Sequence, residues 1–145
     1  MIRTNGRMAA LMANLPKAEA LDGALAAILA RGFVEESGCL FFAESARRRD
    51  HATRSDFEDA TGYECFVNRV DVDDYVAGSE LVAQGVRFAE EVASSLGAKG
   101  PCTVIVSAGD ATCSVRFHRT RSGESWLADD LEGYTHEAIL AIHVP

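Results

Sequence analysis

Five polar side chains in the last third of the chain are of the types that could perform acid–base catalysis. They are Arg116, His118, Glu124, Asp129 and Asp130. A histidine and a carboxylate can pass a proton to and from a substrate, and an arginine beside them can hold a phosphate. A single histidine on a strand is more often structural or merely exposed. We therefore expect no catalytic residue, and the alternative is a small hydrolase or transferase with a site around Arg116 and His118.

A second group of polar side chains lies in the middle of the chain, where Asp71, Asp73 and Asp74 are followed by Tyr75. Clustered carboxylates can bind calcium or magnesium, but the glycine and the distal glutamate of a calcium loop are missing here. Negative side chains are also favoured just before a helix begins. A third interpretation is an acidic docking patch, because aromatic and charged groups together suit protein interfaces.

Trp126 is the only tryptophan, and acidic and aromatic residues follow it closely. These neighbours are Asp129, Asp130, Glu132 and Tyr134. Two interpretations stay open for Trp126: a core side chain whose indole nitrogen meets a carboxylate, or an exposed anchor of an interface.

The four cysteines, Cys39, Cys65, Cys102 and Cys113, indicate buried packing and no metal chemistry. None belongs to a Cys-x-x-Cys pair or has a histidine at ligand spacing, so we expect no zinc site and no cofactor. Their neighbours are apolar or β-branched, which is typical of small buried side chains. We expect reduced thiols in a reducing compartment.

The charge of the chain favours a basic partner. Twenty-two acidic and 14 basic residues give a net charge of -8 over 145 residues, a length that predicts a single domain over residues 1–145. Such a field repels polyphosphate and attracts a basic surface, so direct nucleic-acid binding is disfavoured. The oligomeric state stays open.

The N-terminal stretch begins like a secretory signal, with arginines and then alanines. Pro16, Lys17 and Asp22 interrupt its apolar run. No stretch reaches the roughly 20 apolar residues that span a bilayer, so we expect no membrane contact and a cytoplasmic location.

Hydrophobic periodicity predicts the elements of the first two thirds of the chain. Residues 17–31 have apolar positions at helical spacing, and residues 38–43 form a short apolar strand. Residues 44–61 carry many charges and predict a mobile loop. Residues 63–72 alternate imperfectly and predict a strand with a bulge. The strongest pattern is a helix over 79–96, capped by Ser79, with Gln84 facing water.

The last third of the chain predicts a β-hairpin and a final strand. Residues 102–107 and 112–119 should pair antiparallel, residues 125–131 could form a single helical turn, and residues 137–144 form the last strand. The order of elements predicts an α+β fold: a largely antiparallel four- to five-stranded sheet with two helices packed on one face.

Several segments resemble immunity proteins of bacterial contact-dependent growth inhibition systems. The segments are FVNRV at 66–70, DDYV at 73–76, QGVRFA at 84–89, CSVRFHR at 113–119, GESWL at 123–127, DDLEGY at 129–134 and EAIL at 137–140. The similarity covers about residues 38–144. Residues 1–36 then form an N-terminal helical extension outside the immunity-protein-like core, and residues 44–61 are a second departure.

The resemblance implies that the chain is not an enzyme and that it works by binding a toxin. In such systems a toxin domain enters a neighbouring bacterium, where a cytosolic immunity protein binds it; the toxins are often nucleases, frequently acting on tRNA. A nuclease needs a basic groove, and an acidic protein would compete there with the substrate. The expected contacts form two groups: Asp71, Asp73, Asp74 and Tyr75 from one edge, and Arg121, Trp126, Asp129, Asp130, Glu132 and Tyr134 from the other. The alternatives from other classes are the hydrolase or transferase and a housekeeping interaction module.

Overall fold

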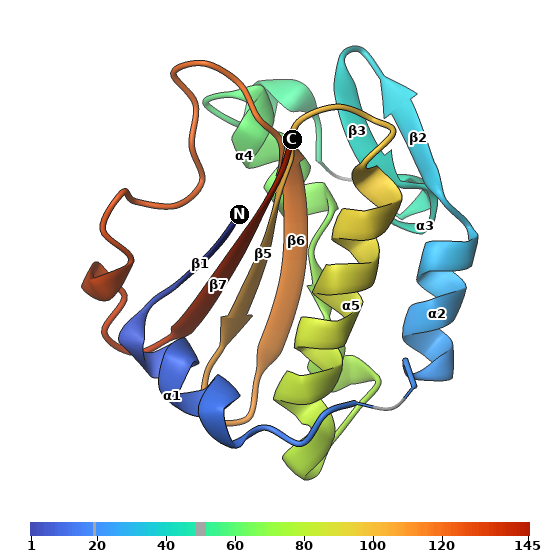
Figure 1. Cartoon of the computed structure of the whole chain (residues 1–145). Coiled ribbons are helices and arrows are strands. Elements are labelled where there is room, and N and C mark those ends of the chain that lie inside the picture. The colour runs from blue at the N-terminus through green and yellow to red at the C-terminus, as the bar shows by residue number, and fades with distance from the viewer. Residues whose placement is uncertain (19, 49–51) are drawn as a thin grey trace.

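A computed structural model of the chain describes residues 1–18, 20–48 and 52–145. Its main feature is a five-stranded antiparallel sheet with the strand order β1-β7-β5-β6-β4 (Figure 1). The strands are β1 (Ile2–Thr4), β4 (Val70–Asp71), β5 (Cys102–Ala108), β6 (Cys113–Arg119) and β7 (Ala138–Val144). A second sheet of two strands contains β2 (Phe33–Glu36) and β3 (Cys39–Phe42). The predicted α+β fold with an antiparallel sheet is confirmed.

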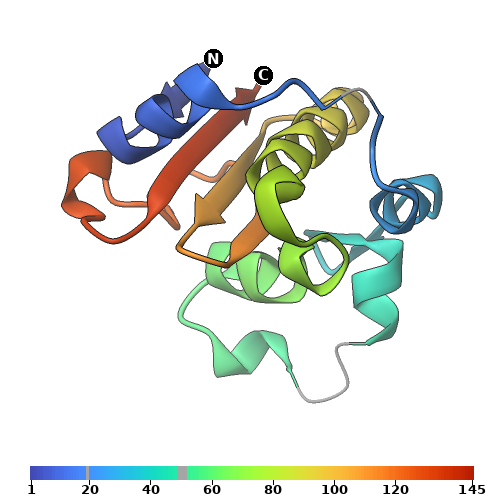
Figure 2. The same cartoon turned by 90° about the horizontal axis from the view of Figure 1, so that it is seen from below.

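Helices cover the sheet. They are α1 (Gly6–Asn14), α2 (Gly23–Ala30), α3 (Ala43–Arg47), α4 (Ala60–Val67) and α5 (Leu81–Leu96). Helix α5 lies along one face of the sheet with α2 beside it, and α4 packs against β6 and β3 (Figures 1 and 2). In the described part of the chain, short 3-10 turns join these elements: η1 (Arg54–Asp56), η2 (Val72–Asp74), η3 (Gly78–Glu80) and η4 (Leu131–Gly133). No helix among the described residues is long and apolar enough to span a bilayer.

The main core lies between α5 and the sheet. Phe88 and Val92 of α5 are completely buried against alternate residues of the strands, such as Val104 and Phe117, which face each other in the β5–β6 register. This arrangement follows from the two periods in the sequence, because a helical stripe and every second strand residue each form one apolar face. The predicted hairpin and the alternation of Val115 and Phe117 toward the core are confirmed.

Residues 60–67 are helical, so the strand predicted over 63–72 is wrong except for β4. The side chain of Asp59 accepts a hydrogen bond from the Gly62 amide at 2.7 Å and caps α4. Helices α3 and α4 and the turn η1 also occupy half of the charged loop predicted over 44–61, whose residues 49–51 lie outside the described residues.

The predicted first helix begins later than expected, at Gly23. The side chain of Asp22 caps the N-terminus of this helix, because it accepts hydrogen bonds from the amides of Ala24 and Leu25. At the start of α5 no side-chain cap is present, so the expected Ser79 cap is wrong. Gln84 is buried instead of facing water, because its amide bonds to Ala20 and Asp22 of the segment before α2.

Residues 1–36 are not a helical extension of a separate core. Strand β1 pairs with β7 at the edge of the main sheet, with Ile2 opposite Ile142. Met8 of α1 and Leu25 of α2 are fully buried in the main core. The single helical turn expected over 125–131 is also displaced, because η4 begins at Leu131.

Candidate functional site

The expected contact residues divide between opposite edges of the sheet. Asp71 belongs to β4, whereas Glu132 accepts hydrogen bonds from the amide of Gly6, the first residue of α1, two positions after the end of β1. Because β1 and β4 are the two outer strands, four strand spacings separate these edges, or about 19 Å. The two groups predicted from the sequence therefore do not form one continuous surface.

The edge at β4 carries an exposed group of aromatic and charged side chains, which we call the β4–η2 surface. It consists of Phe66, Arg69, Asp71, Asp74 and Tyr75, which line a hollow of about 280 Å³ together with Arg48 and other residues. Phe66 is 58% exposed and Tyr75 is 38% exposed. Exposed large rings are typical of interface centres, and carboxylates around them are typical of the polar rim.

A second hollow of about 330 Å³ adjoins the β4–η2 surface, and we call it the sheet-face hollow. Arg69 and Asp71 line both hollows. The other lining residues with polar side chains are Asp73, Ser107, Thr112, Ser114, Arg116 and Glu137, together with the thiol of Cys113. Beside this hollow, the Arg116 guanidinium stacks 4.7 Å from the ring centre of Trp126, which is 41% exposed. Trp126 is therefore partly exposed and lies over Arg116 of β6, the strand next to β4.

The segment between β6 and β7, residues 120–137, turns outward and returns along β1 (Figure 1). Its acidic part is occupied with local contacts. The carbonyl of Asp129 accepts from Arg3, the carboxylate of Asp130 accepts from the amide of Glu132, and the hydroxyl of Tyr134 accepts from the amide of Ala128. The bond from Arg3 and the bond from the Gly6 amide to Glu132 hold the segment against β1 and the start of α1, whereas the other two contacts lie within the segment.

Arg121 is largely buried and pairs with Glu64 of α4. The two side chains meet at 2.6 Å, and Glu64 is fully buried. Burial alone lowers the pKa of Arg121, but the hydrogen bond and the charge of Glu64 raise this pKa above its ordinary value. Arg121 also donates to the carbonyl of Gly38, so its guanidinium connects the loop after β6 with α4 and the β2–β3 turn. This arrangement gives Arg121 a structural role.

The residues that suggested acid–base catalysis are not gathered around His118. His118 is 6% exposed, and its Nδ1 lies 2.7 Å from the carbonyl oxygen of Arg119. Glu124 accepts a hydrogen bond from the amide of Thr61, and Asp129 lies near β1. Only Arg116, two residues away on the same strand, shares the sheet face with His118.

His118 makes the stability of the protein depend on pH. Burial lowers the pKa of His118 below its ordinary value, and the hydrogen bond to Arg119 opposes this shift only partly. The unfolded chain then binds more protons just below pH 6.5, so the free energy of unfolding falls as the pH drops through this window. We expect His118→Gln to flatten this part of the dependence, measured by urea unfolding at about pH 7.5 and 5.5. The matched control is His136→Gln, which replaces an exposed histidine.

The cysteines are buried free thiols, as expected. Burial raises the pKa of Cys65 and of Cys113 to about 12, so neither is a reactive thiolate near neutral pH. Among the residues that the structure describes, no three His, Cys, Asp or Glu side chains are grouped so that they could hold a metal ion.

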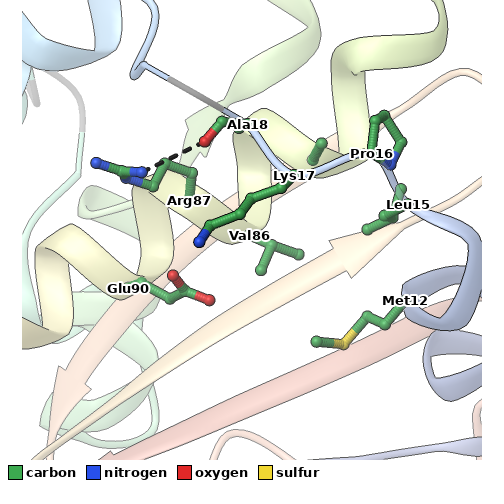
Figure 3. A pocket seen from close by; sticks show the side chains of 9 residues that line it. Met12, Leu15, Pro16, Lys17, Ala18, Val86, Arg87 and Glu90 are labelled. Carbon is green, nitrogen blue, oxygen red and sulfur yellow. Dashed lines mark hydrogen bonds between the residues drawn. The ribbon is translucent and has the colours of Figure 1, made fainter.

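A smaller hollow of about 190 Å³ lies on the other side of the protein, between the segment after α1 and α5 (Figure 3). Met12 and Leu15 extend toward it from α1 and its C-cap, and Val86 lies on α5. Arg87 holds this segment by donating to the carbonyl of Ala18. The hollow contains none of the residues that the sequence singled out for binding.

The sequence did not indicate that Phe66 belongs to the β4–η2 surface or that Glu137 lines the sheet-face hollow. Phe66 stands next to the apolar Val67 in the segment predicted as a bulged strand, and this pattern does not indicate which of the two side chains is exposed. Glu137 lies 66 positions after Asp71 in the chain, and nothing in their spacing indicates that both line one hollow. Only the strand order brings them together.

Comparisons with known proteins give the family of the chain. No curated protein and no solved structure matches it. A family described as the uncharacterized protein PM0498 family matches residues 3–144, which includes most of β1 and all of α1 and α2 and extends well before the expected boundary at residue 38. The chain belongs to the uncharacterized protein PM0498 family.

Proposed function

We propose that this chain is an immunity protein that binds and neutralises a toxin domain of a contact-dependent growth inhibition system. The proposed target is a basic nuclease domain, and the proposed place of action is the cytoplasm, where such a domain would meet its substrate. The segments that resemble immunity proteins support this assignment, together with the net charge of -8.

The observation that carries the proposal is the β4–η2 surface. Phe66 and Tyr75 are large apolar rings that the fold leaves open, and Asp71 and Asp74 lie beside them. Buried aromatic anchors dominate the binding energy of most protein interfaces. Carboxylates around them would occupy positions on a nuclease that otherwise hold phosphates.

The charge of the whole chain would act before contact. An acidic protein is drawn toward a basic target over about one Debye length, which raises the association rate at low salt. The aromatic contacts would then set the dissociation rate, on which most differences in affinity depend.

The test is growth rescue by this chain of cells that express the C-terminal toxin domain of the gene immediately upstream. Co-purification of the two proteins and titration at several salt concentrations would give the affinity. If the toxin domain is toxic and the two proteins form no complex even at low salt, the proposed function is wrong. A substrate turnover that is lost in His118→Gln would support the hydrolase instead.

We expect Tyr75→Ala to weaken the complex by about 2 kcal/mol, which is about thirtyfold in affinity, mainly through faster dissociation. Asp74→Lys should slow association and make it less dependent on salt. Asp129→Lys is the matched control, because this exposed carboxylate lies at the opposite edge of the sheet. If Asp129→Lys weakens binding more than the two variants of the β4–η2 surface, the partner binds at the β1 edge.

A further inference from the structure

Arg116 has an unusual position in the sheet-face hollow. It lies in the middle of β6, on the face of the sheet opposite the main core, and it is half-buried. One side of its guanidinium is covered by Trp126 at 4.7 Å, and the hollow adjoins the rest of the side chain. A cation on an aromatic face is held in place but still needs acceptors for its five N–H groups.

The other charged groups of the sheet-face hollow already have partners. Arg69 Nε donates to Asp71 at 2.8 Å, Asp73 accepts from the amide of Cys113 at 2.9 Å, and Glu137 accepts from the hydroxyl of Ser107. Within residues 1–18, 20–48 and 52–145, no acceptor or ion-pair partner is found for the guanidinium of Arg116. The hollow therefore contains one strong donor group that the protein itself does not satisfy.

The surroundings of Arg116 make its charged form costly to bury. Burial lowers the pKa of Arg116 and the charge of Arg69 adds to this effect, while Cys65, Asp71 and Glu137 oppose it. An acceptor that completed the hydrogen bonds of Arg116 would remove part of this cost of burial. Ser107 and Ser114 bring hydroxyl groups to the same hollow.

The charge of the lining selects the kind of anion. Asp71, Asp73 and Glu137 provide three carboxylates against the two guanidiniums of Arg69 and Arg116. A phosphate dianion would be repelled by this excess of negative charge. A carboxylate has a single charge and a planar fork that matches a guanidinium, and a positive group next to it would be attracted by the acidic side chains.

We infer that the sheet-face hollow binds a carboxylate that is carried next to a positive charge, with Arg116 as the anchor and Trp126 as the platform behind it. This inference rests on the proposed function only where it names the molecule that carries the carboxylate. On a basic toxin the source is an aspartate or glutamate flanked by lysine or arginine. A free amino acid is the other source of the same chemistry.

Fluorescence of Trp126 tests the inference, because it is the only tryptophan of the chain and touches Arg116. The probes are an end-blocked Lys-Asp-Lys peptide, the matched Lys-Asn-Lys peptide, and free glycine. The Asp peptide should change the emission in a saturable way with a Kd of about 1 mM, and the Asn peptide should bind about tenfold more weakly. If only glycine changes the emission, the hollow binds a small zwitterion, and Arg116 is still the residue that holds its carboxylate.

Variants of the anchor separate binding from folding. Arg116→Lys keeps the charge but loses the planar fork, and Arg116→Gln loses both, so binding should fall in the order wild type, Lys, Gln. Thermal unfolding of each variant shows whether the fold is intact. If Arg116→Gln does not fold, Arg116→Lys alone tests the role of Arg116 in binding. The inference is overturned if neither the Asp peptide nor glycine changes the emission up to about 50 mM, or if Arg116→Lys binds both as well as the wild type does.

The outcome is independent of the growth-rescue test. Binding of the Asp peptide without rescue would refute the immunity function and leave the carboxylate site standing. Rescue without binding of either probe would refute the carboxylate site alone.

Discussion

Replacing Glu64 with alanine is expected to lower the free energy of unfolding by about 3–5 kcal/mol, the largest effect of any substitution that we predict. Glu64 is 0% exposed and accepts three hydrogen bonds: from the Leu40 amide at 2.7 Å, the Arg119 amide at 2.9 Å and Arg121 at 2.6 Å. Without the carboxylate, the two amides lose their acceptor and the guanidinium of Arg121 loses its charged partner. Urea unfolding followed by circular dichroism measures the loss.

Two further variants show whether the buried charge is the cause. Glu64→Gln keeps the size of the side chain and one acceptor oxygen, so it should cost less than Glu64→Ala. Glu91→Ala removes the carboxylate of the partly exposed pair between Arg87 and Glu91, and it should cost no more than about 0.5 kcal/mol. If Glu64→Ala costs as little as Glu91→Ala does, the Glu64–Arg121 pair does not hold α4 in place.

Gly85→Ala is expected to destabilise the protein by about 1–3 kcal/mol, although alanine is the better helix former by about 1 kcal/mol. Helix α5 approaches β6 so closely at this glycine that an added Cβ would lie 2.4 Å from Sγ of Cys113. Such a contact forces either a new rotamer of the buried Cys113 side chain or a shift of the helix away from the sheet. Thermal and urea unfolding measure the net effect.

The cause can be isolated with a double-mutant cycle. Cys113→Ala removes the sulfur, after which the nearest remaining atoms to the new Cβ are at 3.9 Å. In this background Gly85→Ala should be neutral or stabilising by up to about 1 kcal/mol, since only the helix propensity remains. Gly23→Ala is the control in α2, where an added Cβ meets nothing within 4 Å and no loss is expected. An equal loss from Gly85→Ala in both backgrounds would contradict the steric explanation.

Local patterns were sufficient for α5 and for the hairpin of β5 and β6. Both elements have long and regular apolar periods, and their partners lie close by in the sequence. The pattern failed at residues 60–67, where a mixture of apolar and polar residues resembles a strand. Three side chains stabilise the helix there. Asp59 caps its N-terminus, and Glu64 and Asn68 form hydrogen bonds with β3 and with the C-terminal half of β6.

Asn68 shows why these contacts could not be predicted. Its amide accepts from Phe42 at 3.0 Å and donates to the carbonyls of Leu40 at 2.8 Å and Phe117 at 3.2 Å. The three partners lie between 26 and 49 positions away in the chain. The preference of a short segment for helix or strand is weaker than such buried hydrogen bonds, so the tertiary contacts determine the local structure.

The sequence by itself determined the α+β class, the antiparallel hairpin, the burial of the cysteines and the acidic charge, because these depend on composition and on periods within one element. Only the tertiary structure decided which polar residues meet. It separated Asp71 from Glu132 by the width of the sheet, paired Arg121 with Glu64 and set Trp126 on Arg116. The order of strands in a sheet follows from long-range packing, which no local pattern contains, and this order decides which side chains share a surface.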